Sequence, residues 1–279
     1  MLITAKPTQF QLRLPFPPST KRTTFNPRRT IILNNNNEDT SNNNTASSYP
    51  PMRIKKNLHR KLYPGETIGI TEEMRFIAMR LRNDTVFTPE TTSTVQDDKD
   101  RVPDMWHPSM EGFIRFLVDN QLLFATLERI VDDSDNVSVV YFRKTRLERS
   151  EGIKKDLEWL KEDGAEIPNP SSPGITYAKY LEELAERSTP LFLSHFYNIH
   201  FSHISAGQVI TKQVSEKLLE GKELEFCKWE GDVQELLKDV REKLNVLSEH
   251  WPRDVKKKCL AETRKSFRFL EQIVRLIIL

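Results

Sequence analysis

One segment combines histidine, aromatic and small residues in an order that suits a flat ligand. Residues 195–210 read HFYNIHFSHISAGQVI. Ser205, Ala206 and Gly207 carry little side-chain bulk, so the backbone around them can approach a planar molecule closely, and Gly207 permits a kink in a helix. Close packing of this helix against a Phe or Trp elsewhere is the alternative interpretation, and the spacing alone favours it.

The histidines of the same segment raise the question of a metal site. His200 and His203 are three residues apart, which places them on neighbouring parts of one helix face. No third ligand is evident, and no histidine of the chain follows a Glu at the Glu-x-x-His spacing of helical di-iron sites. We therefore expect no metal ligands here, and we interpret His195 as a packing residue with satisfied hydrogen bonds.

A second informative spacing joins two arginines. Arg75 and Arg82 are seven residues apart, about two turns of a helix, so both project from the same side. A guanidinium suits bidentate capture of a carboxylate. It does not suit metal coordination, because it stays protonated and has no acceptor lone pair. Without further information, Arg75 and Arg241 are interpreted as members of surface ion pairs.

The elements that must position these residues are helices. From residue 69 onward apolar residues recur at steps of three and four, and no segment shows sustained period-two alternation. The sequence therefore predicts an all-α fold, a compact single-domain bundle of about eight helices, because no repeat of fixed period indicates a solenoid. We expect Thr71 as the first N-cap, a polar linker at 83–105, an interruption near Gly207, and helices at 71–82, 108–130, 147–162, 175–187, 191–219, 231–249 and 252–278.

The first 50 residues differ in composition from the rest. Residues 1–37 contain basic side chains and frequent Ser, Thr and Pro but no Asp or Glu, which is typical of an organellar transit peptide. Prolines and charges interrupt every apolar stretch, which argues against a secretory signal. We assign residues 1–50 to a transit peptide and disordered linker, and residues 55–279 to the helical domain. An ordinary disordered tail is the alternative, and composition alone does not separate chloroplast from mitochondrion.

Composition also limits the classes of partner. The chain has 29% charged and 37% hydrophobic residues, with a net charge of +2. No apolar run approaches the roughly 20 residues that a membrane-spanning helix needs. The near balance of charge gives no overall reason to expect nucleic-acid binding. We expect neither a membrane span nor a nucleic-acid partner.

Six blocks of the sequence, in order, resemble plant chloroplast haem oxygenases. They read EEMRFIAMRL at 72–81, HPSMEGFIRFLVDNQLL at 107–123, DLEWLKEDGAEIPNP at 156–170, HFYNI at 195–199, KELEFCKW at 222–229 and VREKLN at 240–245. The resemblance covers residues 70–279 and implies the helical fold of that family. Together with the N-terminal composition it implies a location in the chloroplast stroma.

The resemblance also implies roles for individual residues. Members of the family hold the propionates of the porphyrin with basic and phenolic side chains, and the matching positions are Arg75, Tyr197 and Arg241. His203 matches the residue that organises the water network for proton delivery to bound dioxygen, and would do so here if the chain is active.

The small residues of the 195–210 segment match only in part. Ser205, Ala206 and Gly207 match the family residues that lie over the porphyrin face. Active plant members commonly have two glycines where this chain has Ala206 and Gly207. The added methyl group could crowd the oxygen pocket or stiffen the kink, although by itself it is a mild change.

The largest departure from the family is at Arg82, which stands where these enzymes present the histidine that binds haem iron. Arginine does not replace that ligand, because guanidinium offers no neutral nitrogen lone pair. Two unit charges 4 Å apart repel by up to about 4 kcal/mol at an effective dielectric of 20, so its charge also opposes a cationic iron. The chain thus resembles the inactive type of the family, without the proximal histidine, and haem is disfavoured as a cofactor.

Three functions follow from the resemblance. The first is an inactive paralogue that binds protoporphyrin rather than haem and influences tetrapyrrole and phytochrome chromophore supply. The second is a weakly active haem oxygenase that uses ferredoxin to cleave haem to biliverdin, carbon monoxide and iron, with water or His107 on the iron. The third is an interaction partner of an active paralogue that binds no tetrapyrrole.

Overall fold

The computed structural model describes residues 62–86 and 107–278, without the side chains of residues 82–86. Every regular element in these ranges is a helix, which confirms the all-α prediction. The transit peptide predicted at 1–50, the domain start at residue 55 and most of the linker predicted at 83–105 lie outside the described residues. In the described ranges no helix is both long enough and apolar enough to cross a membrane.

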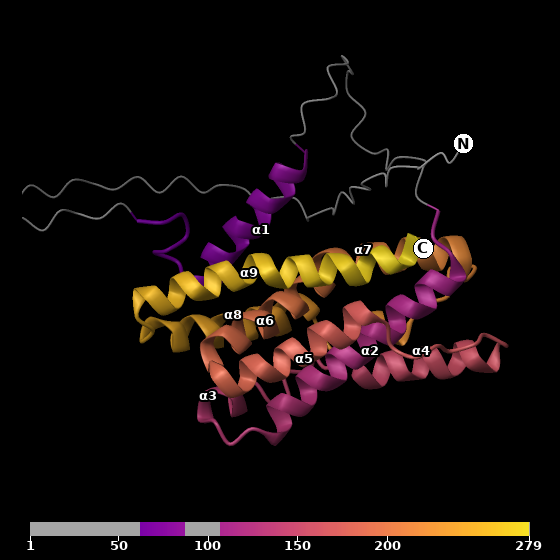
Figure 1. Cartoon of the computed structure of the whole chain (residues 1–279), viewed down its shortest axis with the longest axis horizontal. Helices are drawn as coiled ribbons and strands as arrows, with labels where there is room; N and C mark the ends of the chain where they lie inside the picture. Colours follow the sequence, from indigo (N-terminus) through magenta and orange to yellow (C-terminus); the bar gives the residue numbers. More distant parts are fainter. Residues whose placement is uncertain (1–61, 87–106, 279) are drawn as a thin grey trace, which may run out of the picture. The chain divides into compact units, whose positions relative to one another are not determined.

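The described residues form a succession of helices (Figure 1). Their bounds are α1 Ile70–Val86, α2 Met110–Asp133, α3 Val137–Val140, α4 Ser150–Glu162, α5 Ser172–Arg187, α6 Thr189–Ser202, α7 Gln208–Leu218, α8 Val233–Glu249 and α9 Arg253–Val274. A π-helical turn, η1 (His203–Gly207), joins α6 to α7, and the 3₁₀ turns are η2 (Glu225–Cys227) and η3 (Arg275–Ile278).

Several predicted bounds were wrong, each for a local reason. Helix α1 continues to Val86, over residues predicted as linker. It also begins before the predicted N-cap Thr71, because the Gly69 carbonyl already accepts hydrogen bonds from the N–H groups of Glu72 and Glu73. Helix α5 begins three residues early, at Ser172, because Pro173 lies in its first turn, where a missing N–H breaks no helical hydrogen bond. Helix α3, which was not predicted, starts at Val137 and is capped by Asn136, whose side chain accepts from the Ser138 N–H.

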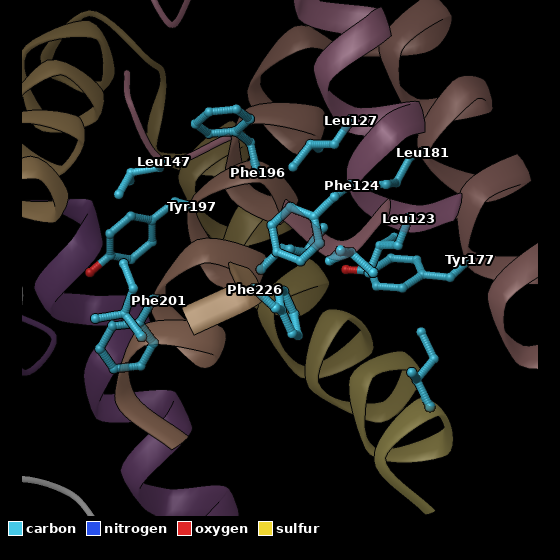
Figure 2. Packing of buried hydrophobic residues seen from close by; sticks show 14 of the residues in the cluster. Leu123, Phe124, Leu127, Leu147, Tyr177, Leu181, Phe196, Tyr197, Phe201 and Phe226 are labelled. Atoms are coloured by element: carbon cyan, nitrogen blue, oxygen red, sulfur yellow. The ribbon is translucent and has the colours of Figure 1, made fainter. Parts of the chain in front are cut away.

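Helix α2 is the central helix of the core, as its broad apolar face predicts. It packs against α4, α5, α9 and η3. In Figure 2 Phe124 of α2 lies among aromatic and aliphatic side chains of α5, α6 and η2. Its ring contacts those of His200, His203 and Phe226 at centroid distances of 5.6, 5.7 and 5.8 Å. The core of the bundle is therefore built around α2 and the segment that carries the histidines.

Two buried carboxylates fix the connections around this core. Asp119 accepts from the backbone N–H groups of Ser171 and Gly174, at 2.7 and 2.9 Å, at the start of α5. Asp156 of α4 accepts from the N–H groups of Glu225 and Phe226, both at 2.8 Å. Each carboxylate satisfies donors at the start of a helix or turn that otherwise lack partners. The second contact holds Phe226 against the core.

Helix α1 is attached to α8 and α9 by buried polar contacts. The Asn245 side-chain oxygen of α8 accepts from the Thr71 N–H at 3.1 Å and from its hydroxyl at 3.0 Å. Glu73 is 3% exposed and accepts two hydrogen bonds from Arg253 of α9, at 2.9 and 2.7 Å. Gly69 has room for no side chain, because a Cβ there would lie 2.5 Å from Asn245. These contacts set the position of α1 on the bundle.

We predict that Glu73→Gln lowers the free energy of unfolding by about 2 kcal/mol, because it removes the bidentate partner of a partly buried guanidinium. The loss stays below the full cost of an unpaired buried charge, since Glu66 remains 3.8 Å from Arg253. Urea denaturation followed by circular dichroism measures the change.

The matched control is Glu235→Gln, which breaks an exposed pair with Lys238 on α8. Its effect should stay within about 0.5 kcal/mol. Equal losses in the two variants would contradict the role given to Glu73.

Candidate functional site

Arg75, Tyr197 and Arg241, the three residues predicted to bind propionates, lie together in the structure. Burial raises the pKa of the Tyr197 phenol, and the charge of Arg241, a hydrogen bond with Arg241 and the charge of Arg75 oppose this rise. The reciprocal effect of Tyr197 also contributes to the raised pKa of Arg75. A hydrogen bond joins only adjacent side chains, and charges shift a pKa in this way only from nearby positions. We call these three residues the basic cluster.

The contact between α1 and α8 explains why the basic cluster forms. Arg75 is one helical turn after Thr71, and Arg241 is one turn before Asn245, so each arginine shares a helix face with one member of the Thr71–Asn245 contact. Tyr197 comes from α6, where it is 2% exposed and stacks on Phe201 at 5.9 Å. In Figure 2 its hydroxyl points toward α1. Three helices thus supply one residue each.

Glu72 is an acidic residue beside the basic cluster, and the sequence interpretation missed its role. Its carboxylate accepts from the Nε of Arg75 at 2.9 Å and from Nη2. The hydrogen bond with Glu72 is the largest cause of the raised pKa of Arg75. The ion pair expected of Arg75 therefore exists, within α1 itself. The i, i+3 spacing of Glu72 and Arg75 was a visible signal for it.

Arg82 lies in α1 two turns after Arg75, at the helical position that its spacing predicts. Its side chain is outside the described part of the structure. The conclusion that it does not bind iron rests on the chemistry of guanidinium.

The small residues Ser205, Ala206 and Gly207 lie in the π-helical turn η1, where an interruption was predicted. The Ser205 hydroxyl donates to the Phe201 carbonyl at 2.6 Å, and Ala206 is 3% exposed. A Cβ at Gly207 would lie 2.8 Å from Nδ1 of His203. Glycine is thus required at this position by packing within the turn. A π-helical turn is frequently found at a functional site, so a ligand contact also stays a prediction.

His203 points into the aromatic core. Its ring stacks on Phe226 at 4.0 Å with an interplanar angle of 15°, and its Nε2 lies 3.2 Å from the Phe226 carbonyl. Because a carbonyl only accepts, Nε2 carries the proton and donates. Burial lowers the pKa of His203 to about 3, so the ring is neutral near pH 7. Its role in proton delivery stays a prediction. The contact with Phe226 joins residues 23 apart in the chain, and no sequence pattern indicates it.

The other two histidines of the segment are also buried. His200 lies between Phe124 and Phe196, and burial lowers its pKa to about 3. It borders a cavity of about 20 Å³ that is also lined by Glu128, Thr145 and Glu148, enough space for one water molecule.

His195 has hydrogen-bond partners on both ring nitrogens. Nδ1 is 2.9 Å from the Tyr177 hydroxyl, and Nε2 is 3.0 Å from a Glu262 carboxylate oxygen. Burial lowers the pKa of His195, and Glu262 only partly opposes this. The interpretation of His195 as a satisfied packing residue is confirmed. Over residues 62–86 and 107–278, no group of three His, Cys, Asp or Glu side chains is arranged to hold a metal ion.

The sequence is similar to one enzyme family over most of its length. The sequence model of the family described as Heme oxygenase matches residues 90–276. A protein of Arabidopsis thaliana named "Probable inactive heme oxygenase 2, chloroplastic" is 59% identical over 239 residues, which cover 81% of this chain and 80% of the relative. "Heme oxygenase 1, chloroplastic" of the same plant is 48% identical over 219 residues, covering 78% and 77%.

Solved structures agree on the fold. A haem oxygenase-1 of the cyanobacterium Synechocystis in complex with haem superposes with a TM-score of 0.52 at 14% identity, over 59% of this chain and 76% of that one. A haem oxygenase 2 of Chlamydomonas reinhardtii without haem gives 0.50 at 19% identity, over 59% and 82%. At these identities the likeness establishes the all-α architecture alone.

The buried histidines predict a dependence of stability on pH. An imidazole in the unfolded chain is protonated below its ordinary pKa of 6.5, whereas His200 and His203 in the folded chain are protonated only near pH 3. The unfolded state therefore binds more protons between these values, and stability falls as pH falls. Each histidine should contribute about 1 kcal/mol per pH unit between pH 6 and 5.

The variant His200→Phe should reduce this slope by about 1 kcal/mol per pH unit, whatever its effect on stability at pH 7. Urea unfolding at both pH values measures the slope. The parent chain, measured under the same conditions, gives the reference slope. An unchanged slope in His200→Phe would show that this histidine is not held neutral.

Proposed function

The chain belongs to the haem oxygenase family, and we propose that it is an inactive member that binds a tetrapyrrole through the basic cluster. Its relatives in Arabidopsis and rice include proteins named probable inactive haem oxygenases of the chloroplast. The relatives' names support a chloroplast location, and we place the protein in the stroma because its N-terminal composition is typical of a transit peptide.

The observation that carries this proposal is the proximity of Arg75, Tyr197 and Arg241. Two guanidinium groups and a phenolic hydroxyl offer several hydrogen-bond donors, and guanidinium binds a carboxylate in a bidentate manner. A porphyrin with two propionates presents two carboxylates on one edge of a flat apolar ring. The cluster fits that edge.

The residues present do not fit haem iron. Arg82 occupies the sequence position of the iron ligand and has no lone pair to offer. His203 donates its Nε2 proton to the Phe226 carbonyl from a stacked position in the core, so this nitrogen is not free to bind a metal. The chain therefore retains groups for the propionates and lacks one for the metal, which favours protoporphyrin over haem.

Binding without cleavage suits a regulatory role. A protein that holds protoporphyrin in the stroma lowers its free concentration and so influences the flow of tetrapyrroles, including the supply of phytochrome chromophore. An active paralogue or ferredoxin is the protein partner that the family suggests. Neither requires an iron ligand in this chain.

We predict that Arg82→His creates a haem site. The introduced imidazole supplies the missing nitrogen ligand, so haemin should give a sharp Soret band, while protoporphyrin affinity should change little because the basic cluster is intact. Absorbance titration measures the first effect and porphyrin fluorescence the second. Arg80→His is the control, because it places a histidine at an exposed position of the same helix.

The result separates three functions. Biliverdin formation by Arg82→His with reduced ferredoxin would show that Arg82 alone prevents haem cleavage. If no biliverdin forms, Ala206 also contributes to the loss of activity. Haemin turnover by the parent chain would identify a weakly active enzyme instead. Absence of a spectral response to any porphyrin, with capture of an active paralogue, would identify an interaction partner.

A further inference from the structure

Glu72 occupies an edge of Arg75 that can hold a carboxylate through paired hydrogen bonds. Its two oxygens accept from Nε and Nη2 of that arginine. The remaining Nη1 lies 3.3 Å from Sδ of Met79. The Nε–Nη2 edge is one of the edges through which a guanidinium forms paired hydrogen bonds with a carboxylate. A propionate that binds Arg75 through this edge must share it with Glu72 or displace Glu72.

The burial of Glu72 sets this ion pair apart from the other pairs between neighbouring turns. Its side chain is 20% exposed, whereas Glu111 and Glu235, which also pair with a basic residue on their own helix, are 76% and 68% exposed. Charges that are partly removed from water interact more strongly and are less screened by salt. The carboxylate of Glu72 therefore acts on its surroundings more than a solvated surface charge would.

The charge of Glu72 extends to the other members of the basic cluster. It raises the pKa of Tyr197, whereas Arg241 and Arg75 lower it. Two arginines and one glutamate leave one net positive charge near the phenol. A porphyrin with two propionates brings two negative charges. Glu72 thus reduces the attraction of the cluster for such a ligand and competes with it for Arg75.

We propose that Glu72 is the internal counter-ion of the basic cluster, which holds Arg75 as a ligand carboxylate would and is displaced by a dicarboxylate tetrapyrrole. This inference rests on the proposed function, because it concerns the same site. Glu72 keeps the guanidinium of Arg75 oriented and sets the affinity for anionic ligands below the value that the two arginines alone would give. The affinity for ligands without free carboxylates does not depend on Glu72.

The test compares two probes with the full-length chain. Protoporphyrin IX has two free carboxylates, and its dimethyl ester has none. Glu72→Gln removes the charge, and Glu72→Ala removes both the charge and the acceptor. If one variant folds poorly, the other still measures the effect of the charge. Each should bind protoporphyrin IX about fivefold more tightly than the parent, with no change for the dimethyl ester. Porphyrin fluorescence titration at low salt gives the affinities.

Glu111→Gln is the matched control, since Glu111 also pairs with an arginine of its own helix, Arg115 of α2. It should leave both affinities unchanged. Weaker binding of protoporphyrin IX by both Glu72 variants would overturn the inference, because Glu72 would then support Arg75 rather than compete for it. Unchanged binding, or equal tightening for the ester, would also overturn it. If the parent binds no protoporphyrin, the proposed function itself fails.

Discussion

The contact between Thr71 of α1 and Asn245 of α8 is the constraint on which the candidate site depends. Arg75 and Arg241 are remote in sequence, and each projects from a helix face one turn away from this contact. The buried pair of Glu73 and Arg253 holds the same helix on α9. If α1 lost these contacts, Arg75 would no longer be held beside Tyr197 and Arg241, even with the rest of the core intact.

The π-helical turn that holds Ser205, Ala206 and Gly207 depends on packing around His203. Asp156 holds the backbone of Phe226, Phe226 stacks on His203, and His203 lies where a side chain at Gly207 would be. The π-helical turn is thus fitted to a histidine that faces the core. Ala206, the departure from the two-glycine pattern, lies in this turn and is buried. If ligand binding changed the conformation of this turn, the aromatic side chains packed around His203 would therefore have to move as well.

The periodicity of apolar residues predicted the helices and the central place of α2, because burial of one helix face is a local pattern. The resemblance identified the members of the basic cluster, which the fold then brings together. The contacts of Glu73, Asp156 and His203 could not be predicted, since each joins residues that are distant in sequence. Glu72 was different: its spacing from Arg75 was visible, but its burial beside Tyr197 is a property of the fold.

In the proposed function, the chain keeps groups for the carboxylate edge of a porphyrin and lacks a ligand for the metal. The measurement that tests this most directly is the ratio of affinities of the unaltered chain for protoporphyrin IX and haemin. We predict that protoporphyrin binds more tightly by about tenfold or more, equivalent to about 1.4 kcal/mol. Haemin binding that is equal or tighter, with a sharp Soret band, would contradict the account.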